Sequence, residues 1–114
     1  MLLIYADEAM DVDVTPDHIQ EMMAAYGAYI QNLAQAGVLI ATEGLQSTAT
    51  ATTVKVRGGQ TLTTHGPFAE TAEQLGGFVL IECGNLDEAI SWAAQCPTAP
   101  MGSVEVRPVM DYGQ

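Results

Sequence analysis

The pattern of apolar and polar positions predicts two amphipathic helices. Over residues 16–36, apolar side chains recur every three or four positions, which is the spacing of a helix that packs one face on a sheet. Thr15 supplies a capping hydroxyl before this stretch, and Gly37 supplies a terminating residue after it. A shorter apolar stripe follows the capping-box residues 85–88 and stops at Pro97, which predicts the second helix.

The same pattern predicts six strands, in the order strand, helix, strand, hairpin, strand, helix, strand. Their expected bounds are residues 2–6, 38–45, 48–57, 60–64, 76–83 and 103–108. This order is typical of an α+β fold of the ferredoxin-like split βαβ type, with an antiparallel sheet, both helices on one face and a β-hairpin insert.

Two dipeptides that contain glycine shape the strands. Gly58-Gly59 is typical of a two-residue hairpin turn, and pairing across it places Lys55 and Arg57 on one face of the hairpin. Glu43-Gly44 indicates a bulge or a close backbone approach in the second strand.

The strand at residues 76–83 is apolar on both faces, with Phe78 and Leu80 on one and Val79 and Ile81 on the other. Two helices on one side cover only one of these faces. A large exposed apolar patch is unusual on a monomer, so the bare face is expected to meet a second copy. We therefore expect a single domain of residues 1–114 that forms a homodimer.

The composition restricts the partners. Hydrophobic residues make up 48% of the 114 positions and charged residues 15%, as in globular chains. The formal net charge of -11 repels phosphate backbones and anionic membranes. Residues 1–5 are apolar but have no basic start, unlike a signal peptide or a membrane span. We expect a cytoplasmic protein that binds neither nucleic acid nor membrane.

The sharpest candidate for chemistry is His65, because imidazole changes charge near neutral pH and acts as a general base or acid when a carboxylate orients it. Glu70 follows across a Gly-Pro turn, and the two form the predicted catalytic pair. The alternative is that His65 ends a strand and hydrogen-bonds the loop backbone. The predicted substrate-binding residues are Arg57, Lys55, Glu43 and Phe68.

No metal or cofactor is expected. His18 and His65 are far apart in the sequence, and residues 7–14 lack the Gly and the terminal Glu of a calcium loop, so they are interpreted as a solvated acidic loop. Cys83 and Cys96 lack Cys-x-x-Cys spacing and are interpreted as buried thiols. The Met22-Met23 pair favours core packing, with a pliable ligand surface as the alternative.

Residues 65–78, HGPFAETAEQLGGF, resemble the motif of the YCII-related, or DGPF-domain, family of small bacterial proteins. The likeness extends from MLLIY at residues 1–5 to GSVEVRP at residues 102–108. It implies a dimeric α+β barrel, a fold shared with small isomerases, dehydrochlorinases and monooxygenases, and a link to genes of extracytoplasmic-function sigma factors. Three positions depart from the family pattern: His65 replaces the usual Asp, Ala72 a common Lys, and Pro100 an Arg found in that segment.

These observations favour a small-molecule-binding, enzyme-like cleft near His65, and they leave open whether it turns over a substrate. The alternative is a non-catalytic ligand-binding or protein-interaction accessory associated with sigma-factor-dependent transcription. Fold class does not decide between them, because function depends on the site that a fold carries.

Overall fold

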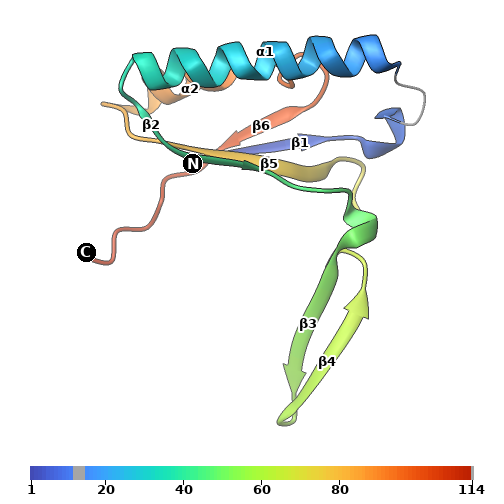
Figure 1. Ribbon diagram of the computed structural model, residues 1–114. Helices are drawn as coiled ribbons and strands as arrows, with labels where there is room; N and C mark the ends of the chain where they lie inside the picture. Colours follow the sequence, from blue (N-terminus) through green and yellow to red (C-terminus); the bar gives the residue numbers. More distant parts are fainter. Residues whose placement is uncertain (12–14, 114) are drawn as a thin grey trace.

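A four-stranded antiparallel sheet carries both helices on one face (Figure 1). The computed structural model describes residues 1–11 and 15–113. Its strands lie in the order β2-β5-β1-β6, so the predicted ferredoxin-like arrangement is confirmed. The elements of this unit are β1 (Leu2–Ala6), α1 (Pro16–Gln35), β2 (Leu39–Gly44), β5 (Gln74–Ile81), α2 (Leu86–Ala94) and β6 (Ser103–Val106).

The inserted hairpin forms a separate two-stranded sheet of β3 (Thr52–Arg57) and β4 (Gln60–His65). Its register is the predicted one, with Lys55 opposite Leu62 and Arg57 opposite Gln60. Figure 1 shows the hairpin on the side of the sheet away from the helices.

The predicted start of the hairpin at residue 48 is wrong. Residues 48–50 form the 3-10 turn η2 (Thr48–Thr50), and β3 begins two residues later. The Ser47 hydroxyl accepts a hydrogen bond from the Ala49 amide at 3.1 Å. Such a local side-chain bond offers the backbone an alternative to the strand that β-propensity favours.

Both helices begin at the caps that the sequence predicts. The Thr15 hydroxyl accepts from the His18 amide at 3.2 Å, and the Asn85 side chain accepts from the Glu88 amide at 2.9 Å. After α1 the chain turns at Gly37, whose φ of 76° is in the left-handed region that glycine tolerates.

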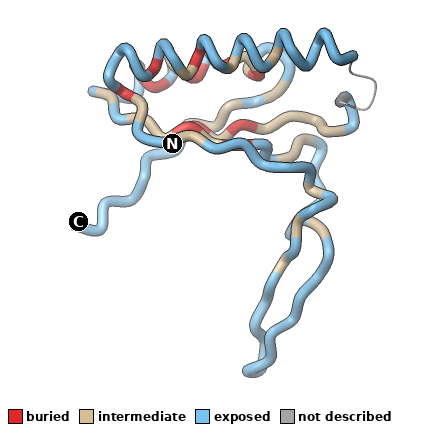
Figure 2. Tube along the Cα trace, in the orientation of Figure 1, coloured by how far each residue is buried: buried red, intermediate tan, exposed pale blue. Residues whose placement is uncertain are grey.

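The core lies between α1 and the sheet, where Leu2, Leu33, Val79 and Cys96 are fully buried. Figure 2 shows the buried positions along the side of α1 that faces the sheet. The predicted burial of Cys96 is confirmed, whereas Cys83, which was also predicted to be buried, is only half-buried. The core assignment of Met23 is wrong, because this side chain is 70% exposed.

The bulge predicted at Glu43-Gly44 is wrong in position, since the register of β2 shifts between Leu39 and Ala41. The alternative, a close backbone approach, is confirmed for the backbone of Glu43, but the glycine it requires is Gly77, since a Cβ atom at Gly44 would meet no atom of the described residues within 4 Å. A Cβ atom at Gly77 would lie 2.8 Å from the carbonyl oxygen of Glu43, so this pairing of β2 with β5 needs glycine.

The acidic segment after β1 is more ordered than a solvated loop. Residues 8–11 form the 3-10 turn η1 (Glu8–Asp11), and residues 12–14 of the predicted loop lie outside the described residues. The Glu8 carboxylate accepts from the Thr48 amide at 3.0 Å and from its hydroxyl at 2.6 Å. This side chain therefore joins η1 to η2.

Gly102→Ala is predicted to destabilise the fold by about 3 kcal/mol, because the added Cβ would overlap the carbonyl oxygen of Tyr5 and approach the Thr98 methyl group at 2.9 Å. Gly27→Ala is the matched control. It lies within α1 with nothing within 4 Å of the new atom, and it should stabilise the protein by about 0.5–1 kcal/mol. Urea unfolding of both variants measures the difference, and equal midpoints would contradict this packing.

Candidate functional site

A cleft opens between α1 and the sheet. It consists of an inner hollow of about 330 Å³ and an outer hollow of about 620 Å³. Ala6, Tyr26 and Thr98 line both hollows and so mark the place where they meet.

Small residues on the sheet create the inner hollow. Ile4 lies opposite Gly77, and Gly77 lies opposite Gly44, so these positions share the face that carries the helices. At the other end of the sheet, the same face carries Leu2 opposite Val79, which fill the space beneath the helices. At the end that carries Gly44 and Gly77, no side chain of the described strands fills the space beneath the helices, so that space stays open.

The outer hollow is lined mainly by apolar side chains of α1. Met22 is half-buried there and Met23 is exposed, with Ile19 one turn earlier and Met101 on the connection between α2 and β6. His18 lines the same hollow and is exposed. Both methionines therefore line this hollow, and the alternative interpretation of the pair as a pliable ligand surface stays a prediction.

A hydroxyl pair lies at the junction of the hollows. The hydroxyls of Tyr26 and Thr98 share a hydrogen bond, and the Cys96 thiol lies 3.4 Å from the Tyr26 oxygen. Thr98 is only 7% exposed, and its carbonyl accepts from the amides of Met101 at 3.0 Å and Gly102 at 2.7 Å, which fixes its position. The pair provides polar groups in a mainly apolar cleft.

Burial, followed by the Cys96 contact, raises the pKa of Tyr26 from 10.0 to about 12. The neighbouring Tyr29 donates to the carbonyl of Trp92 at 2.8 Å, and burial raises its pKa as well. Tyr26 is therefore a neutral phenol at physiological pH. It is suited to hydrogen bonding and is a poor general base.

The predicted catalytic residues lie elsewhere. His65 is exposed at the end of β4, opposite Thr52, and lines neither hollow of the cleft. Glu70 lines a shallow hollow of about 360 Å³ on the loop between β4 and β5, together with Thr48 and Gln74. The catalytic role of His65 and Glu70 stays a prediction.

The hairpin brings two predicted substrate-binding residues together. The Lys55 ammonium lies 5.5 Å from the centre of the Phe68 ring, within the range of a cation–π contact. Arg57 is at the hairpin turn and His65 at its base, five strand positions or about 17 Å apart. A single chain therefore does not bring Arg57 and His65 to one cleft.

Glu43 lies on the lining of the inner hollow. Alternation along β2 places its side chain on the face opposite Thr42, away from the helices, so its contribution to the cleft is attributed to the backbone. The sequence analysis missed Tyr26 and Thr98 as site residues. Tyr26 was recognisable only as a member of the apolar stripe, and Thr98 stands in an irregular connection without a motif.

No helix among the described residues is long and apolar enough to cross a membrane. Within the same residues, no three His, Cys, Asp or Glu side chains gather as a metal site would require.

Comparison with known proteins identifies a family and a relative. The model of the YCII-related domain matches residues 1–112. The uncharacterized protein R00369 of Rhizobium meliloti (strain 1021) is 37% identical over 113 residues, which cover 97% of this chain and 91% of the relative. Both matches cover the sheet, the helices and the hairpin.

Tyr26→Phe is predicted to remove a phenol that ionises near pH 12 instead of pH 10. Folding raises the pKa of Tyr26. The stabilisation that its protonated phenol gives the fold is therefore fully present below pH 10 and is lost as the pH rises toward 12. At neutral pH the free energy of unfolding of the variant should be about 1 kcal/mol lower, because the buried hydroxyl of Thr98 loses this hydrogen-bond partner. The phenolate absorbance of the two proteins during alkaline titration is the measurement, and a difference centred at pH 10 would contradict the buried hydroxyl pair.

Proposed function

The chain belongs to the YCII-related domain family, and we propose that it binds a small, mainly apolar molecule in the cleft between α1 and the sheet. The observation that carries this proposal is the Tyr26–Thr98 hydroxyl pair at the junction of two mainly apolar hollows. Apolar walls with a few convergent polar groups are the usual form of a small-molecule site.

The walls and the charge define the class of ligand. Each hollow lies within the range of about 300–1,000 Å³ that is common for ligand pockets. Met22 and Met23 adapt to different shapes, and the neutral phenol of Tyr26 serves a hydroxyl or carbonyl group. A chain of net charge -11 repels anions at long range, so a neutral aromatic alcohol or phenol suits the cleft better than a carboxylate.

Ligand binding in this cleft does not depend on catalysis by His65. The accessory role in sigma-factor-dependent transcription rests on the family resemblance and stays a prediction, as does the cytoplasmic location.

We also propose that the protein forms a homodimer through the sheet face away from the helices. Glu43, Phe78, Leu3 and Glu105 lie in one row across this face, with the apolar side chains in the middle and a carboxylate on each edge strand. In Figure 2 the hairpin and the C-terminal segment, which lie on this side of the sheet, both extend away from it. Apposition of two such faces would complete the α+β barrel.

The dimensions of the chain support the dimer. Its accessible surface is 8140 Å², whereas a compact monomer of 12.0 kDa exposes about 6,000 Å². Its radius of gyration is 16.3 Å, against about 13 Å for a compact domain of this length. If each copy buried its excess accessible surface in the dimer, the two copies together would bury about 4,000 Å². This area is within the range of obligate dimers.

Ala6→Leu is predicted to weaken ligand binding at least tenfold, because the larger side chain enters the junction of the two hollows. Ala28→Leu, on the exposed side of α1, is the control and should bind like the parent. Saturation-transfer NMR with a panel of neutral monocyclic phenols and aromatic alcohols provides the measurement. The cleft proposal fails if no compound binds the parent, or if Ala6→Leu binds unchanged.

Leu3→Glu is predicted to convert the dimer to a monomer at micromolar concentration, since it places a charge in the middle of the proposed interface. Leu86→Glu is the control, because Leu86 is 60% exposed on α2. Sedimentation equilibrium of the three proteins reports the mass. A monomeric parent, or a dimer that persists in Leu3→Glu, would contradict the proposed face.

A further inference from the structure

The β3–β4 hairpin, residues 52–65, stands away from the rest of the chain and is called the arm below. Figure 2 shows it exposed over most of its length. Val54, Val56 and Leu62 are 58%, 59% and 48% exposed, respectively, and Thr53 alone in the arm is partly buried. A two-stranded hairpin by itself is at best marginally stable in water, so this ordered arm needs cover.

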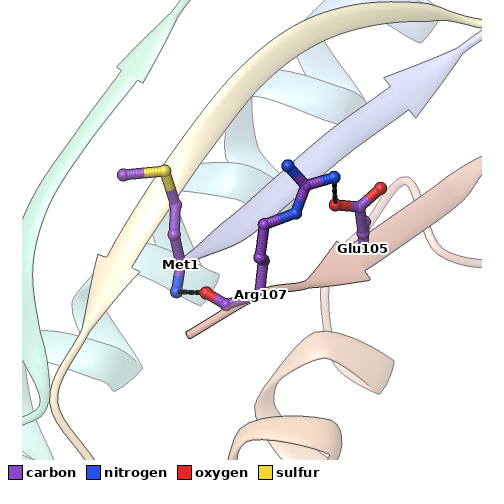
Figure 3. Close-up of polar contacts among 3 residues, drawn as sticks. All are labelled: Met1, Glu105 and Arg107. Carbon is purple, nitrogen blue, oxygen red and sulfur yellow. Dashed lines mark hydrogen bonds and ion pairs between the residues drawn. The ribbon is translucent and has the colours of Figure 1, made fainter. Parts of the chain in front are cut away.

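The charge of the arm is opposite to that of the body. The arm contains Lys55 and Arg57 and no acidic residue, whereas all fourteen acidic residues of the chain lie outside it. The third cation, Arg107, is ion-paired with Glu105 of its own chain, as Figure 3 shows. Among the described residues, no carboxylate lies within ion-pairing distance of Lys55 or Arg57.

We infer that the arm docks on a second copy of this chain, with Lys55 and Arg57 turned toward the acidic surface of that copy. The inference rests on the proposed homodimer and adds the element that holds it together. Two bodies of high negative charge repel each other. Docking places the cations of the arm against the acidic surface of the partner, which offsets this repulsion. Docking also removes the exposed valines of the arm from water.

The reach of the arm fits this contact. A strand of six residues is about 20 Å long, whereas two packed sheets lie about 10 Å apart. Because the arm leaves the sheet on the side away from the helices, it would extend past the edge of an apposed partner sheet. On that face the edge strand β6 carries Glu105, which is already ion-paired with Arg107, and the edge strand β2 carries Glu43, which is the carboxylate that the arm would meet.

The direct test is charge reversal in the arm, Lys55→Glu with Arg57→Glu. The dimer dissociation constant, measured by sedimentation at low salt, is expected to rise about tenfold or more. The difference from the parent should shrink at high salt, because exposed charges are then screened. The control, Lys55→Arg with Arg57→Lys, keeps both charges and should remain within about twofold of the parent.

Hydrogen exchange of the unmodified protein gives a second measurement. The arm amides should exchange more slowly well above the dissociation constant than well below it. If the parent is a dimer whose arm amides are unprotected, or whose affinity is unchanged by charge reversal, the arm contact is wrong while the dimer stands. If the parent is a monomer at every concentration, the dimer and the arm contact both fail.

Discussion

Two helices pack on one face of a four-stranded sheet, and this one-sided packing determines where the chain has room to bind anything. Leu33 of α1 meets Leu2 and Val79 of the sheet in a closed core at one end. At the other end the sheet offers Gly44 and Gly77, so α1 lies over empty space and a cleft results. The opposite face keeps its apolar row uncovered, with the arm beside it.

The cleft and the core depend on the same connection between α2 and β6. Cys96 is buried in the core, and Thr98, two residues later, closes the cleft against Tyr26. Gly102 then lets the chain pass directly against β1. Stability and the shape of the cleft are therefore coupled in this segment, because a change that shifts it moves the polar group of the cleft. The open sheet face and the arm lie outside this coupling.

The sequence predicted the order of elements, the helix caps and the hairpin register, because these depend on local periodicity and on glycine in the turn. It placed a cleft near His65 and did not predict the one under α1, which arises where Ala6 has only a methyl group and Gly44 and Gly77 have no side chain, three positions far apart in the chain. Periodicity placed Met23 on the inner side of α1 but did not show that this part of the helix borders an open hollow. His65 and Arg57 belong to one hairpin, yet strand geometry separates them along its length.

In the proposed dimer, a second copy covers the bare sheet face and the arm. The most direct measurement is an isotope-filtered NOE experiment on a mixed sample of labelled and unlabelled chains, which detects only contacts between copies. We expect such contacts from the methyl groups of Leu3 and Leu80 on the sheet, and from Val54 and Val56 on the arm. Contacts between copies that arise only from the helix side, for example from Ala28, would contradict this account.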